Sequence, residues 1–207
     1  MKTKEKIIQK SLSLFNNTTF ELTTTNLIAK KSGVLEGSLW YHFNSKSDLV
    51  SEHTKLFLNA FSDQKKYLEK NAPQDLIQGL FSMYEVLWDY RYLMRDSFEQ
   101  IATDDPMLYK KIIDINCSID HLAKDTIFHS KDVGVLIIDE KDINDIVEIT
   151  LIILRHWLDY SMKKYPSKSN VYLRKKGINL LIKTLYPYLG DESKKIMDFV
   201  YVSDQPI

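Results

Sequence analysis

Apolar residues recur at helical spacing along most of the chain. Ile8, Leu12 and Phe15 fall at positions i, i+4 and i+7, which predicts a first helix over residues 3–16 with one buried face. We expect this helix to end at Asn16, because asparagine can adopt the left-handed conformation that ends helices. Further helices are predicted over residues 24–32, 36–43, 45–70, 74–102 with a break near 89–92, 105–122, 142–165 and 170–189, with a short one near the end. The pattern leaves residues 129–141 unassigned, and the fold is predicted to be all-α.

Turn-forming and capping residues divide the first fifty positions into short helices. Thr24 is placed to cap the second helix, and Gly33 can take the positive φ that the following turn needs. Ser45 and Asp48, three residues apart, form a capping-box pattern that opens a long fourth helix. The first three helices are expected to share a small core, to which these residues contribute: Ile8, Leu12, Phe15, Phe20, Ile28, Ala29, Val34, Leu39, Phe43 and Leu49.

The composition fits a helical protein with a packed core. Of 207 residues, 44% are apolar, and only 6 are glycine and 5 are proline, which argues against a turn-rich β fold. Apolar runs such as residues 151–154 are far too short to span a bilayer, and no secretory signal follows the first lysines. The single cysteine, Cys117, excludes an internal disulfide and fits a reducing compartment, so we expect a cytoplasmic protein without a membrane partner.

Charge is unevenly distributed although the chain is neutral overall. Residues 1–50 hold seven lysines against four acidic residues, a net charge of +3, and the remainder carries −3. A basic head on an acidic body is typical of a polyanion-binding module joined to a body that does not bind the polyanion. We take residues 1–46 as the head and residues 47–207 as the body.

Residues 24–49 have the pattern of a helix-turn-helix unit, whose second helix enters the major groove of DNA. Leu39 and Phe43 face inward, so two large aromatic side chains are left on the outer face of the third helix. Contacts with bases, sugars and phosphates would explain them. Lys46 lies at a helix N-terminus, where free backbone N–H groups favour phosphate. The predicted DNA-contacting residues are Thr24, Thr25, Glu36, Gly37, Ser38, Trp40, Tyr41, His42 and Lys46.

Most of these residues also have a purely structural interpretation. Trp40 or Tyr41 could cover the core of the head, and His42 could form hydrogen bonds at the helix end. Thr24 and Thr25 could act only as helix caps. The sequence leaves these alternatives open.

The same segment resembles the tetracycline-repressor (TetR) family of bacterial regulators. The match runs in fixed register through Ile-Ala at 28–29, Gly-Val at 33–34, GSLWYHF at 37–43 and SKSDL at 45–49, within a resemblance that covers about residues 4–60. It implies a DNA-reading third helix, a homodimer paired through the last two long helices of each subunit, and a ligand cavity in the body. Leu35 and Glu36 depart from the family pattern, which has a capping Ser or Thr followed by a basic or polar residue. A carboxylate at position 36 repels phosphate but can accept a hydrogen bond from cytosine N4.

Residues 142–165 are apolar around more of the helix than one packed face requires. A stripe of about 100° suffices for packing within a subunit, so the surplus suggests a second buried face at a dimer interface. Gly177 allows close approach of a helix to the apolar stripe of residues 178–189. The predicted interface residues are Ile146, Ile149, Ile153, Trp157, Ile178, Ile182 and Leu185. The alternative is a central helix that is buried all round within one subunit.

The middle helices are rich in aromatic and methionine side chains. Each one could be ordinary core, but together they are compatible with a largely apolar ligand cavity. The predicted pocket residues are Phe57, Phe61, Tyr84, Trp88, Tyr92, Phe98, Cys117 and His121. Arg91, Arg95 and Arg155 could recognise an anionic ligand, although Arg95 and Glu99 also have the spacing of an intrahelical ion pair.

Motifs of catalysis and of cofactor binding are absent from the sequence. Asp114, Cys117 and His121 share a helix face and could bind zinc together, but no fourth ligand is identifiable. No metal, no cofactor and no enzymatic activity are therefore expected. We expect a homodimeric repressor that binds a double-stranded DNA operator and is released by a largely apolar small molecule. A helical enzyme acting on a small molecule and a DNA-binding regulator without an effector are the alternatives.

Overall fold

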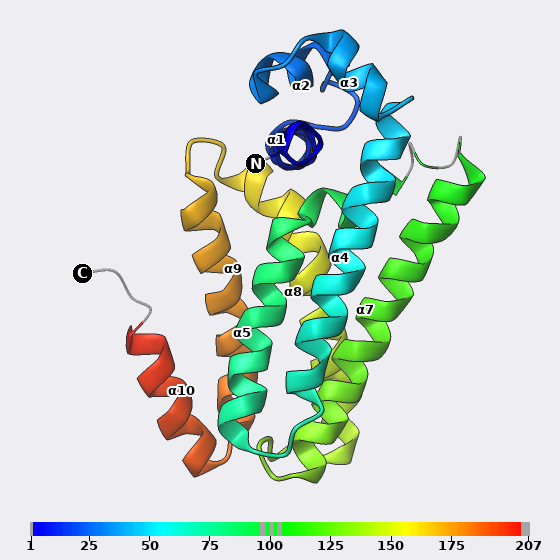
Figure 1. The fold of residues 1–207 in the computed structure, drawn as a ribbon. Coiled ribbons are helices and arrows are strands. Elements are labelled where there is room, and N and C mark those ends of the chain that lie inside the picture. Colours follow the sequence, from blue (N-terminus) through cyan, green and yellow to red (C-terminus); the bar gives the residue numbers. More distant parts are fainter. Residues whose placement is uncertain (1, 96–97, 100–101, 103–104, 204–207) are drawn as a thin grey trace. The chain divides into compact units, whose positions relative to one another are not determined.

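The computed structural model describes residues 2–95, 98–99, 102 and 105–203, with side chains up to residue 199. Within these residues the only extended pairing is an isolated bridge between Leu136 and Leu189, so the predicted all-α class is confirmed. The helices are α1 (Thr3–Asn17), α2 (Thr25–Ser32), α3 (Glu36–His42), α4 (Lys46–Leu68), α5 (Pro73–Asp89), α7 (Pro106–Asp132), α8 (Glu140–Lys164), α9 (Asn170–Leu185) and α10 (Asp191–Ser203), with the 3-10 helices η1 (Arg91–Met94) and η2 (Tyr186–Tyr188) (Figure 1).

The predicted helix caps in the first fifty residues are confirmed. The Thr24 hydroxyl accepts a hydrogen bond from the Leu27 N–H at 3.1 Å, and Gly33 has φ of 68° directly after α2. At the start of α4, the Ser45 hydroxyl accepts from the Asp48 N–H at 3.2 Å. The Asp48 carboxylate accepts from the Asn44 N–H at 2.7 Å, so both ends of this turn are satisfied.

The end of α1 differs from the prediction. Within the described residues only Gly33 and Gly134 have positive φ, so Asn16 does not end the helix in a left-handed conformation. The Thr18 N–H and the Thr18 hydroxyl both donate to the Leu14 carbonyl instead, at 2.8 and 2.6 Å. Asn16 is buried and forms tertiary hydrogen bonds, which are described below.

Packing divides the chain into two compact units. Unit 1 comprises Met1–Ala60 and Asp89–Asn116, and unit 2 comprises Phe61–Trp88 and Cys117–Ile207. This grouping does not follow a single cut at residue 46, because residues 89–116 are grouped with the first helices. The assignment of DNA binding to residues 1–46 therefore stays a prediction about function.

The core of unit 1 joins α1, α2 and α3. Phe15, Ile28 and Leu39 are fully buried, as expected from their spacing. The buried stripe of α1 begins one residue earlier than predicted, at Ile7, whereas Ile8 and Leu12 are half-buried. The sequence pattern missed this register because the next position on the stripe is Ser11, which is polar yet fully buried.

Unit 2 contains the end of α4 from Phe61, α5 up to Trp88, the second part of α7, and α8, α9, η2 and α10. Gly177 permits a close approach there, as predicted, but within one subunit. A Cβ at this position would lie 2.5 Å from two indole atoms of Trp157 and would also collide with the Tyr84 hydroxyl. None of the described helices has an apolar stretch long enough to cross a lipid bilayer.

Candidate nucleic-acid interface and ligand cavity

The third helix exposes an aromatic ridge. Leu39 is fully buried, whereas Trp40 is 44% and Tyr41 86% exposed, and His42 is half-buried with its ring 5.1 Å from that of Tyr41. The exposed aromatic face expected from the sequence is therefore present. Gly37 is exposed on the same helix, and no atom lies within 4 Å of the position of a Cβ there. A flat partner surface can approach this turn of the helix closely.

Thr25 and Glu36 contact each other rather than facing solvent as free groups. The Thr25 hydroxyl donates to the Glu36 carboxylate at 2.6 Å, and the Asn26 amide donates to it at 3.4 Å. No side chain caps α3 at Leu35, so these bonds from α2 hold the first turn of α3. A carboxylate has more acceptor sites than these two donors use, so the reading of cytosine by Glu36 stays a prediction.

Lys46 is also held within the subunit. Its ammonium donates to the carbonyls of Phe20 at 2.7 Å and Thr23 at 3.1 Å, and lies 4.3 Å from the Phe20 ring centroid. Burial lowers the pKa of Lys46, and the carboxylate of Glu21 opposes this shift. These bonds hold Lys46 against the segment between α1 and α2, and its phosphate contact stays a prediction.

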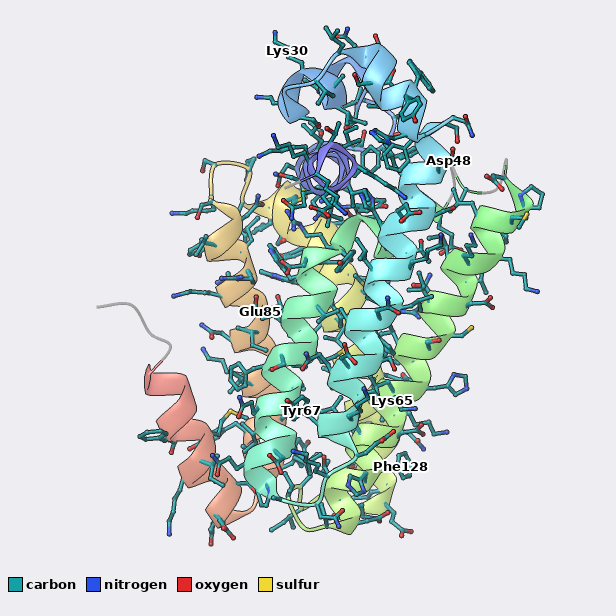
Figure 2. The ribbon with its side chains drawn as sticks, viewed as in Figure 1. Lys30, Asp48, Lys65, Tyr67, Glu85 and Phe128 are labelled. Carbon is teal, nitrogen blue, oxygen red and sulfur yellow. The ribbon has the colours of Figure 1, made fainter. Side chains whose placement is uncertain are left out.

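Two lysines of α2 face solvent. Lys30 and Lys31 lie in its last turn, and both are exposed. Figure 2 shows Lys30 extending away from the helix. Both lysines contribute to the predicted net charge of the head, and their position at the end of a helix that packs on α3 also follows from the motif.

A buried hydrogen-bond cluster, which the sequence did not predict, holds the end of α1. The Asn16 amide donates to the Asp89 carbonyl at 2.7 Å and accepts from the Tyr92 N–H at 3.1 Å. Arg91 donates to the Asn17 side chain at 3.0 Å. Arg95 donates to the carbonyls of Asn16 and Thr18 at 3.0 and 3.2 Å. Two of the arginines considered for an anionic ligand therefore fix η1 to α1.

His53 occupies the centre of unit 1. It is fully buried on α4, with Nδ1 2.8 Å from the Tyr92 hydroxyl and Nε2 3.0 Å from the Ile8 carbonyl and 3.1 Å from the Ser11 hydroxyl. Burial lowers the pKa of His53 to about 4, so the ring is neutral at physiological pH. Burial likewise raises the pKa of Tyr92 well above its ordinary value. Neutral groups thus link α1, α4 and η1.

Unit 2 contains an apolar cavity. Its described wall is drawn from α4, α5, α7, α8, α9, α10 and two connecting segments. The lining residues are Phe61, Leu68, Leu76, Ile77, Leu80, Met83, Tyr84, Leu87, Ile119, Leu122, Ala123, Thr126, Ile127, Ser130, Val135, Leu136, Thr150, Leu154, Leu185, Leu189 and Met197. Such a wall suits a largely apolar ligand.

The predicted pocket residues divide between this cavity and other places. Phe61 and Tyr84 line the cavity, and Trp88 is buried in unit 2 with its ring stacked on Tyr84. The others are corrected as lining residues: Phe57, Tyr92 and Phe98 belong to the core of unit 1, and Cys117 and His121 are exposed. Aromatic composition could not separate them, because a core and a cavity wall use the same residue types.

The zinc hypothesis gains no support from the described residues, in which no group of three His, Cys, Asp or Glu side chains could hold a metal ion. His121 Nδ1 lies 2.7 Å from the Cys117 carbonyl, one turn earlier on α7, rather than beside its sulfur.

The predicted dimer residues lie on two faces of the last long helices. Five of them are buried within the single subunit and are corrected: Ile146, Trp157, Ile178, Ile182 and Leu185. Ile149 is 42% exposed and Ile153 is half-buried. Together with Ile152 and Tyr160, which are 57% and 54% exposed, they form a second apolar stripe on α8.

A helix-turn-helix unit with an aromatic ridge on its second helix defines a class of DNA-binding proteins. Comparison with known proteins specifies the class. A family model described as "Bacterial regulatory proteins, tetR family" matches residues 7–52, and one described as "Bacterial transcriptional repressor" matches residues 52–197. The chain belongs to the TetR family of bacterial transcriptional regulators.

The individual relatives share only part of their length or a low sequence identity with this chain. The HTH-type transcriptional repressor KstR2 of Mycolicibacterium smegmatis is 31% identical over 80 residues, which are 38% of this chain and 39% of KstR2. The alignment thus spans about two fifths of that relative. A TetR-family regulator of Marinobacter aquaeolei VT8 has the same fold over 100% of both chains, with a TM-score of 0.74 and 24% identity. A SmeT–triclosan complex covers 92% of this chain and 93% of its own, with a TM-score of 0.58 and 17% identity.

Proposed function

We propose that the chain is a homodimeric transcriptional repressor that binds a double-stranded DNA operator and is released by a small-molecule effector. The observation that carries this proposal is the exposure of Trp40 and Tyr41 on a helix whose Leu39 is fully buried. Exposed aromatic side chains that lie next to one another commonly mark an interaction site. Membership of a family of bacterial repressors supplies the class of partner.

The DNA contacts follow from what α3 and α2 leave exposed. Tyr41, Trp40 and His42 enter the major groove and meet base edges, with Gly37 and Ser38 at the close approach. Thr24 lies exposed at the start of α2, and its N–H is available for a phosphate oxygen. Lys30 and Lys31 supply positive charge for phosphates. Thr25 and Glu36 also hold the first turn of the reading helix, and Lys46 holds the segment before α2, through the bonds described above.

The dimer interface uses the exposed stripe of α8. Ile149, Ile152, Ile153 and Tyr160 recur on one face of the helix, opposite the face that packs inside the subunit. Pairing two such stripes buries apolar surface that water otherwise covers. A dimer also presents two reading helices to half-sites about 34–36 Å apart, one turn of DNA.

The effector is proposed to bind in the apolar cavity of unit 2. The solved SmeT–triclosan complex, which has the same fold, also holds a small molecule. Among the described lining residues there is no carboxylate, imidazole or thiol that could act as an acid, base or nucleophile, which favours binding over catalysis. To lower the DNA-competent fraction from 99% to 1%, the effector must prefer the released state by about 10⁴-fold, or roughly 5.5 kcal/mol.

The DNA-binding step is tested on duplexes selected from a random library by the full-length protein. We expect Tyr41→Ala to weaken binding to the selected duplex by roughly tenfold or more, since each good base contact contributes about 1–3 kcal/mol. Tyr67→Ala is the matched control, because Tyr67 is also an exposed tyrosine but lies near the C-terminal end of α4, outside the helix-turn-helix unit (Figure 2). Unchanged binding by Tyr41→Ala, or equal losses in both variants, would refute the assignment of α3 as the reading helix.

A further inference from the structure

The wall of the cavity in unit 2 carries no charged side chain among its described residues. Its polar groups are four hydroxyls, on Tyr84, Thr126, Ser130 and Thr150. A charged ligand would lose its hydration on entering such a site and gain no ion pair in return. The wall therefore favours an uncharged ligand.

The arginines of unit 2 do not change this electrostatic balance. Arg155 forms an ion pair with Asp120 at 2.6 Å, and Arg174 with Glu85 of α5 at 2.7 Å. Neither guanidinium is among the described lining residues of the cavity. An anionic ligand would have to displace a carboxylate from one of them.

One hydroxyl of the wall is distinctive. Thr150 is buried, and its Oγ1 has no hydrogen-bond partner among the described residues. The Tyr84 hydroxyl, by contrast, donates to the Arg174 carbonyl at 3.1 Å. A buried polar group without a partner is unfavourable, and such groups commonly mark a place where a bound molecule supplies the partner.

We propose that the cavity binds an uncharged, largely apolar molecule with one oxygen that hydrogen-bonds to Thr150. Threonine in a helix has two accessible χ1 rotamers, so its hydroxyl can turn to meet a ligand without moving the backbone. Alcohols, ketones, esters and lactones of medium size share this chemistry. The assignment of this molecule as the effector rests on the proposed function, whereas its chemical class rests on the wall of the cavity.

The charge requirement is tested with two probes that share one ring system. N-phenyl-1-naphthylamine is neutral, and 1-anilinonaphthalene-8-sulfonate is the same molecule with a sulfonate. Fluorescence titration of the full-length protein should give a Kd at least about tenfold lower for the neutral probe. Equal binding, or tighter binding of the sulfonate, would overturn the uncharged class.

The location is tested by filling the cavity. Ala123→Phe and Leu80→Phe add bulk to different walls, on α7 and α5, and each should weaken the neutral probe by about tenfold or more. Circular dichroism melting identifies a variant that has lost its fold, and the other variant then decides the outcome. Undiminished probe binding in a folded variant would place the probe outside this cavity and contradict the proposal.

The hydrogen bond is tested with 1-decanol, measured by its displacement of the neutral probe. Thr150→Val keeps the shape of the side chain. It should weaken the binding of 1-decanol by about fivefold, because one neutral hydrogen bond is lost. Thr184→Val is the matched control, because the Thr184 hydroxyl already donates to the Leu180 carbonyl at 3.0 Å and is not among the described lining residues. Equal affinities in Thr150→Val and the wild type would remove the role of Thr150.

These outcomes are distinguishable from a failure of the proposed function. If Tyr41→Ala leaves operator binding intact, the repressor assignment fails while the probe results stand. If the sulfonate probe binds as well as the neutral probe, the ligand class fails while operator binding stands.

Discussion

Protonation of His53 should destabilise the folded protein in mildly acidic solution. The imidazole is fully buried, with Nδ1 2.8 Å from the Tyr92 hydroxyl and Nε2 near the Ile8 carbonyl. Burial lowers its pKa from 6.5 to about 4, and the Ile8 carbonyl and the carboxylate of Glu52 only partly oppose this shift. The folded chain therefore holds His53 neutral at pH values where the unfolded chain protonates it.

The sign and size of the effect follow from the two pKa values. Because the folded pKa is the lower one, the unfolded state binds more protons between pH 6.5 and 4. The stabilisation is complete above pH 6.5 and is lost as the pH falls toward 4. A difference of roughly 2.5 units at 1.36 kcal/mol each gives about 3 kcal/mol, a large share of the stability of an ordinary domain.

Urea unfolding of the wild type and of His53→Gln at pH 7.5, 6, 5 and 4.5 measures this difference. Glutamine does not titrate, so the stability advantage of the wild type over His53→Gln should shrink by about 2–3 kcal/mol across this range. Asn44→Ala changes no ionisable group and should keep a constant difference from the wild type across this range. A wild-type advantage that stays constant with pH would refute the assignment of a neutral buried His53.

Three further substitutions test the hydrogen bonds of unit 1, the packing of unit 2 and the proposed dimer interface. Asn16→Ala removes one buried and one part-buried hydrogen bond to the backbone and should lower the free energy of unfolding by about 1–3 kcal/mol, whereas the exposed Asn44→Ala should change it by less than about 0.5 kcal/mol. Gly177→Ala places a methyl group against an indole and a phenol and should cost about 1–3 kcal/mol in chemical denaturation, while Gly37→Ala has open space and should cost little. Ile152→Lys puts a charge on the proposed dimer face and should shift the protein to monomers in analytical ultracentrifugation at micromolar concentration; an unshifted dimer would place the interface elsewhere.

Local signals in the sequence predicted the helix-turn-helix geometry well. The cap at Thr24, the positive φ at Gly33 and the turn at Ser45 each depend on partners within four residues. The apolar spacing of α3 likewise predicted that Leu39 is buried and Tyr41 exposed, although the helices that cover Leu39 are α1 and α2. Caps and turns of this kind depend on neighbouring residues in the chain, so a single sequence suffices to predict them.

Polar side chains with distant partners were not predictable in the same way. Lys46 binds carbonyls 23 and 26 residues away, and Asn16 binds backbone groups 73 and 76 residues away. Local spacing places both residues at helix ends, where capping or phosphate binding is the ordinary expectation. Only the tertiary fold shows that both side chains form hydrogen bonds inside the subunit.

The predicted dimer interface shows a third kind of limit. The sequence correctly indicated that α8 is apolar on two faces, but not which face belongs to the core of its own subunit. Ile146 and Trp157 lie on the inner face, and Ile149 and Ile152 on the outer one. Neighbouring positions of equal hydrophobicity carry no information about which stripe finds a partner within the chain.

The two faces of α8 also connect the ligand proposal with the dimer proposal. Thr150 and Leu154 line the cavity, and Ile149 and Ile152 lie on the exposed stripe of the same turns of the helix. A helix moves as a rigid element, so a ligand that displaces Thr150 also displaces the stripe that pairs with the second subunit. In the proposed dimer, a shift or tilt of α8 changes how the two subunits pair, and DNA with fixed half-site spacing requires one pairing of its two readers. An effector can therefore weaken operator binding through the dimer interface, provided that it binds the displaced arrangement more tightly than the DNA-competent one.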